Sequence, residues 1–226
     1  MSAHTEATAE DGAVLAHHFD TFEQQQESQL LGMWLFLVTE VMFFGGMFVT
    51  YGVYRFLHPE AFAIASRHLD LWMGAGNTAV LLCSSLAMAL AVHSAQERSR
   101  AGTLFFLVLT LVLGVTFLAI KGMEYNHKFH HHLVPGRDFV LSDPKEAPHA
   151  KAAELFFGLY FLMTGIHAFH MIIGISVLAL LIYRCLMWRK GPTFMSVELT
   201  GLYWHFVDVV WVFLFPLLYL IDRVAR

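Results

Sequence analysis

The stretch LGMWLFLVTEVMFFGGMF, residues 31–48, decides the fold, because it is apolar or uncharged throughout except for one carboxylate, Glu40. At least nine uncharged residues flank Glu40 on either side, which places it near the middle of a segment long enough to enter a bilayer. A charged group at that depth costs at least about 2.5 kcal/mol and normally marks a function or a specific partner. Glu40 is therefore the first candidate functional residue.

The composition of the whole chain points to lipid as its solvent. The 226 residues have a mean hydropathy of +0.57, and 57% of them are hydrophobic. Only 14% are charged, against about 25% in an ordinary soluble domain. The net charge of −4 is small and no basic cluster is present, so the sequence predicts no nucleic-acid partner.

Five apolar runs predict an all-α integral membrane bundle of five transmembrane helices. A spanning helix needs about 20 apolar residues, and in lipid the backbone must satisfy its own hydrogen bonds, which favours helices over open strands. We expect a polar N-terminal tail (1–29) and one transmembrane domain (30–226), with a loop or short helix over 121–154. Gly45 and Gly46 are small enough to let a neighbouring helix approach closely. The expected helices cover about 30–55, 71–93, 103–121, 153–184 and 203–222.

Five ionisable residues are expected at membrane depth, either to handle protons or to bond helices together. They are Glu40, His167, His170, His205 and Asp208. His167 and His170 lie three residues apart, on one helical face, and near the middle of their run as Glu40 is of its own. We therefore expect Glu40 to be protonated and hydrogen-bonded to His167 or His170. His205 and Asp208 have the same spacing and are candidates for a polar pair near one membrane face.

The same residues do not complete a haem or metal site. A bis-histidine haem needs axial ligands from two facing helices, and a di-metal centre needs several carboxylates in E-x-x-H arrangements. Neither set is complete. The tract His127-Lys-Phe-His130-His131-His132 has the composition of a metal-binding tract, but a solvated, weakly binding tract explains it as well. The sequence thus predicts no catalytic residue, no bound cofactor and no metal site, and favours a subunit over a lone enzyme.

Several segments together resemble subunit III of the haem-copper cytochrome c oxidases. Residues 31–48 resemble the Glu-bearing helix of that family, and TGIHAFHMIIG (164–174) resembles its T-G-x-H-x-x-H-x-x-x-G segment. YWHFVDVVWVFLFPLLY (203–219) is similar to the final helix of the family, and Lys121-Gly-Met-Glu124-Tyr125 matches its short E-Y motif. The matches occur in order and spread over residues 31–219.

The resemblance implies the short, five-helix form of this family, with a supporting role in aerobic respiratory electron transport. Such a subunit binds neither haem nor copper, which belong to its partner subunits in the proton-pumping complex. It packs against oxidase subunit I, other oxidase subunits and membrane lipids, stabilises subunit I and assists proton delivery.

The resemblance also implies a location and an orientation. The chain would cross the cell inner (plasma) membrane with its N-terminus cytoplasmic and its C-terminus periplasmic. The charge pattern favours the reverse. With the N-terminus cytoplasmic, the inside segments carry only five Lys or Arg residues and the outside segments carry nine, whereas positive charge normally collects inside. We follow the resemblance over this count.

Other functions stay open at the level of sequence. The chain is also compatible with a subunit III-like component of a quinol oxidase or a nitric oxide reductase, or with a stand-alone proton channel or transporter. Transporters usually show internal repeats and broken helices, and neither is visible in the sequence.

Overall fold

The computed structural model of the chain describes residues 19–136, 139, 147–187 and 193–221. These residues form six α-helices and one 3-10 turn, and no strand occurs among them. Five of the helical segments are long and apolar enough to cross a membrane, which confirms the predicted all-α membrane bundle. The elements are α1 (Phe22–Leu57), α2 (Pro59–Arg67), α3 (Leu71–Gln96), α4 (Arg100–His130), η1 (Ala147–His149), α5 (Ala150–Met187) and α6 (Phe194–Tyr219).

The spanning helices are longer than the apolar runs that predicted them. α1 begins at Phe22, inside the expected polar tail, and α4 continues to His130, inside the expected loop over 121–154. The apolar run marks only the part of a helix that needs lipid, and the helix itself continues until a capping residue or a break ends it. Residues 1–18 of the expected tail lie outside the described part of the chain.

Short polar side chains set where the helices begin. The carboxylate of Asp70 accepts hydrogen bonds from the backbone N–H groups of Trp72 and Met73, at 3.0 and 3.1 Å, and so caps α3. Thr21, Ser99 and Thr193 cap α1, α4 and α6 in the same way. Each cap satisfies donors that have no partner inside the helix.

The short helix α2 was not expected from the sequence. It has a proline at its first position, where the missing N–H costs nothing. Its side chains Phe62 and Ala65 are fully buried, and the ring of Phe62 meets the ring of Phe156 on α5 at 5.4 Å. This element closes one end of the bundle and is stabilised by its packing on α5.

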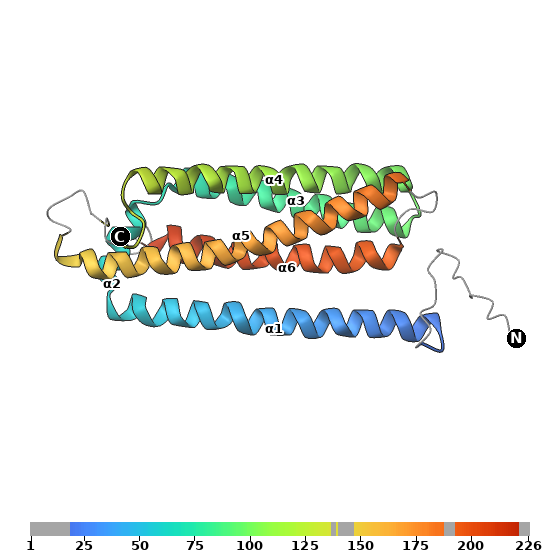
Figure 1. Cartoon of the computed structure of the whole chain (residues 1–226), viewed down its shortest axis with the longest axis horizontal. Helices are drawn as coiled ribbons and strands as arrows, with labels where there is room; N and C mark the ends of the chain where they lie inside the picture. The colour runs from blue at the N-terminus through green and yellow to red at the C-terminus, as the bar shows by residue number, and fades with distance from the viewer. Residues whose placement is uncertain (1–18, 137–138, 140–146, 188–192, 222–226) are drawn as a thin grey trace, which may run out of the picture.

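The helices divide into a packed group of four and one helix beside it. Figure 1 shows α3, α4, α5 and α6 gathered together, with α1 alone along the side of α5 and α6. α1 buries only three of its 36 residues, namely Leu37, Phe44 and Tyr51. Most of the apolar surface of α1 is therefore open to lipid or to another protein.

Glycines matter most where the large ring of Trp204 enters the bundle. A methyl group added at Gly114 would lie 2.7 Å from this ring, and one added at Gly174 would lie 3.1 Å from it. By contrast, a methyl group on Gly45 or Gly46 would meet nothing within 4 Å among the described residues. The expected close approach of a neighbouring helix at Gly45 and Gly46 is thus wrong within this chain, because their side of α1 faces outward.

Candidate functional site

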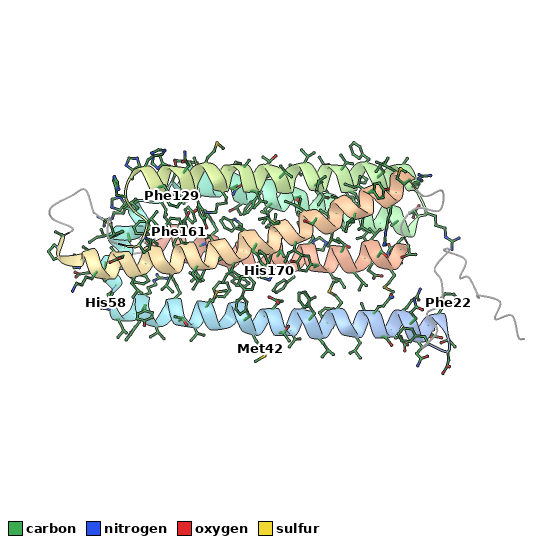
Figure 2. All side chains as sticks on the ribbon, in the orientation of Figure 1. Phe22, Met42, His58, Phe129, Phe161 and His170 are labelled. Atoms are coloured by element: carbon green, nitrogen blue, oxygen red, sulfur yellow. The ribbon has the colours of Figure 1, made fainter. Side chains whose placement is uncertain are left out.

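The membrane-depth carboxyl of α1 has a partner on α5. Glu40 Oε2 lies 3.1 Å from Nε2 of His170, and both side chains are largely enclosed, with 18% and 11% of their surfaces exposed. Figure 2 shows His170 near the middle of α5, whereas Met42 points away from the bundle on the far side of α1. Of the two histidines expected to bond Glu40, the structure selects His170.

The surroundings of His170 fix its orientation. Its Nδ1 lies 2.9 Å from the backbone carbonyl of Ile166, so Nδ1 carries a hydrogen and donates it there. In a neutral ring Nε2 is then an acceptor, and a protonated Glu40 can donate to it. The ring of Phe44 meets the imidazole at 5.3 Å, and Tyr203 donates its hydroxyl to the carbonyl of His170 at 3.0 Å. His170 thus presents Nε2 to the carboxyl of Glu40 beside the ring of Phe44.

His167 occupies a different environment from His170. It is 1% exposed, and its ring lies 5.1 Å from that of Trp211 and 5.5 Å from that of Phe117. Neither of its nitrogens has a hydrogen-bond partner within the described residues. His167 precedes His170 by three residues on α5. This offset is enough for His167 to face α4 and α6 while His170 faces α1. His167 is therefore a buried aromatic-packing residue and does not contact Glu40.

His205 and Asp208 do not bond to each other. His205 Nδ1 lies 2.8 Å from the hydroxyl oxygen of Ser85 on α3. Asp208 is 3% exposed; its carboxyl oxygens make no hydrogen bond of normal geometry among the described residues, but the hydroxyl of Ser85 lies close enough to interact with the carboxyl. The expected polar pair is therefore wrong, because the neighbouring helix α3 supplies a closer partner for the imidazole.

A second buried polar cluster lies where α4, α5 and α6 meet. Lys121 Nζ donates to Glu124 Oε2 at 2.9 Å and to the hydroxyl oxygen of Tyr219 at 2.7 Å. Tyr160 and Tyr219 donate to the other carboxylate oxygen, Glu124 Oε1, at 2.9 and 2.6 Å. The ammonium also lies 4.7 Å from the ring of Trp211. We call these five residues the α4 ion-pair cluster.

The bonding of this cluster is complete enough to hold two charges away from water. Lys121 and Glu124 are 5% and 3% exposed. Burying an ion pair is favourable only when further hydrogen bonds satisfy the remaining donors and acceptors, and the two tyrosine hydroxyls do so here. The cluster joins three helices at one end of the bundle.

A signal for this cluster is present in the sequence, but the apolar-run criterion left Glu124 outside the expected helix. Lys121 is the last residue of the expected helix 103–121, and Glu124 lies three residues beyond it, in the expected loop. Their spacing of three residues is that of an ion pair on one helical face. The continuation of α4 to His130 is what brings both residues into the bundle.

Comparison with known proteins gives the same family as the sequence motifs. The sequence model of a family described as cytochrome c oxidase subunit III matches residues 4–132 and 138–222. The chain belongs to the cytochrome c oxidase subunit III family.

Similar proteins of this family come from several fishes. Cytochrome c oxidase subunit 3 of Formosania lacustris is 32% identical over 222 residues, which cover 92% of this chain and 74% of the relative. The subunits of Petromyzon marinus and Oncorhynchus mykiss give the same identity and coverage.

Family membership makes this chain a membrane-embedded component of an oxidase complex. Two of the segments that carried the resemblance, residues 31–48 and 164–174, meet in the structure through Glu40 and His170. A third contributes Lys121 and Glu124 to the α4 ion-pair cluster. Across the described residues, no three His, Cys, Asp or Glu side chains gather as metal ligands.

Proposed function

We propose that this subunit III-family chain is a non-redox support for oxidase subunit I, which it stabilises and supplies with protons. The observation that carries the proposal is the Glu40–His170 pair, held at mid-membrane between α1 and α5. A neutral acid–imidazole pair can move its proton from the acid to the imidazole and become an ion pair, which places no isolated charge in lipid. When the pair hands a proton to its partner, a replacement proton must follow to restore neutrality. Such a pair next to a proton-consuming partner can act as a local proton reserve.

The docking part of the proposal rests on α1. Its outward apolar surface includes Leu35, Val38, Val41 and Met42, which are 54–73% exposed in the described chain. Gly45 and Gly46, with open space beside them, would let a partner's helix approach the α1 backbone. We assign this side of α1 to contact with subunit I, and the remaining apolar surface to membrane lipids and other oxidase subunits.

A depletion experiment tests the supporting role. The complex without this subunit should start at its normal rate of oxygen reduction, because electrons need not pass through a chain without a redox centre. It should then lose activity with turnover. Inactivity from the first turnover, with the haems intact, would exclude a purely supporting role.

Reconstitution with variants separates proton supply from packing. Glu40→Gln keeps the shape and the ability to bond His170, but it cannot release a proton. The reassembled complex should inactivate faster than one containing the matched variant Glu27→Gln, which changes an exposed carboxylate near the start of the same helix. Equal inactivation of the two variants would remove Glu40 from the proton-supply role.

We further propose that the chain binds no haem, copper or iron of its own. The support is the lack of a complete ligand set in the sequence and the enclosure of His167 among aromatic rings. The purified chain should show no Soret band and no stoichiometric copper or iron by elemental analysis. A haem spectrum from the chain alone would contradict the non-redox assignment.

We place the chain in the inner (plasma) membrane with a cytoplasmic N-terminus and a periplasmic C-terminus. The five possible spans require the two ends to lie on opposite faces. A reporter enzyme that is active only in the periplasm, fused after residue 226, should be active, and one fused before residue 1 should be silent. The opposite pattern would favour the orientation predicted by the positive charges.

A further inference from the structure

The histidine tract 127–132 plays no part in the proposed oxidase role, yet the structure arranges two of its members as a pair. His127 and His131 are four residues apart at the C-terminal end of α4. Their Nε2 atoms lie 3.1 Å from each other and their ring centroids are 4.3 Å apart. Both side chains are exposed. Two imidazoles thus turn their Nε2 atoms toward each other at the surface of the chain.

We propose that His127 and His131 form a two-histidine site for Zn²⁺. Zn–N bonds are about 2.0–2.1 Å long, so two nitrogens on one tetrahedral zinc ion lie about 3.3 Å apart. The two Nε2 atoms, now 3.1 Å apart, would have to move only slightly further from each other. The ring that donates its Nε2–H in the pair takes its other tautomer on binding, with the hydrogen on Nδ1. Water molecules complete the coordination.

The end of α4 holds the two rings on a fixed backbone. His131 is the C-cap residue, and its N–H donates to the carbonyl of His127 at 3.2 Å. His132 follows with a φ of 54°, and the N–H of Leu133 reaches back to the carbonyl of Lys128 at 3.2 Å. This is the hydrogen-bond pattern of a Schellman ending. The ligand backbone is therefore already ordered before a metal ion arrives.

Two further contacts anchor this last turn. The ammonium of Lys128, between the two ligands in sequence, is 2% exposed and donates to the backbone carbonyl of His68. The side chain of Leu133 is 5% exposed. The free carbonyls at a helix C-terminus also favour a cation nearby. The site lies at the end of the bundle where α1 ends and α5 begins (Figure 1).

The same tract supplies matched controls. His130 and His132 are also exposed, but neither belongs to the facing pair. The full chain in detergent is titrated with ZnCl₂ against a chromophoric zinc indicator. Wild type should bind one zinc ion per chain. His127→Gln and His131→Gln should each weaken binding at least about tenfold, since each breaks the linkage of two ligands.

His130→Gln and His132→Gln should change the zinc affinity by less than about twofold, because neither side chain is one of the two linked ligands. Zinc should also raise the thermal unfolding midpoint of wild type and not that of His131→Gln, with circular dichroism confirming equal helix content. Equal losses in all four variants would show a diffuse tract in place of a defined pair and overturn the proposal. Wild-type binding as weak as that of His127→Gln would do so too.

Discussion

Lys121→Met should be one of the most damaging single substitutions in the chain. Lys121 Nζ lies 2.9 Å from Glu124 Oε2. At this distance two unit charges attract by about 6 kcal/mol with an effective dielectric constant of about 20. Part of that attraction offsets the cost of burying the charges. Methionine keeps the side-chain length and leaves Glu124 charged with only its two tyrosine donors.

We expect this change to lower the free energy of unfolding by about 3–5 kcal/mol, as for other buried ion pairs that lose one partner. The double variant Lys121→Met/Glu124→Leu removes both charges and should lose less than either single variant. The coupling energy between the two sites should then be at least about 3 kcal/mol, the top of the usual range for residues in contact. Lys151→Met makes the same change at an exposed lysine on α5 and should stay within about 0.5 kcal/mol of wild type.

The assay is reversible unfolding of the purified chain in mixed micelles, followed by circular dichroism as the denaturing detergent is increased. The four cluster states (wild type, two single variants and the double variant) form one thermodynamic cycle. Losses that simply add would show that Lys121 and Glu124 do not stabilise each other. A Lys121→Met variant within about 1 kcal/mol of wild type, well below the cost of a broken buried pair, would refute the cluster as a structural joint.

Two further predictions concern packing and the membrane-depth carboxyl. Gly114→Ala should destabilise the bundle by about 1–3 kcal/mol, the usual cost of overpacking, because its methyl group would lie 2.7 Å from the ring of Trp204; Gly46→Ala, with open space around it, should not, and equal melting temperatures for both would contradict the packing. Infrared spectroscopy of the chain at pH 7 should show a protonated-acid band that vanishes in Glu40→Gln, while Glu40→Ala should weaken the contact of α1 with α5 by up to about 1–2 kcal/mol. A carboxylate band from Glu40 at pH 7 would instead place the shared proton on His170.

The amino-acid sequence by itself determined the number of spanning helices and their approximate places. Apolar runs of bilayer length can be recognised from neighbouring residues alone. In lipid, such a run must form a helix to satisfy its own backbone hydrogen bonds. The same local reasoning placed Glu40 at membrane depth and marked the motifs of the subunit III family. It failed at helix ends and at α2, because capping side chains and packing, not hydropathy, decide those boundaries.

Only the tertiary structure decided which polar groups meet. His167 and His170 are equivalent by spacing and depth, but the rotation of α5 turns His170 to Glu40 and His167 to the rings of Trp211 and Phe117. In the same way, the imidazole of His205 bonds to the hydroxyl of Ser85 on α3 and not to Asp208. Partner choice depends on how each helix is rotated and shifted against its neighbours. Those two quantities are set by side-chain packing over whole helix faces, which no short stretch of sequence contains.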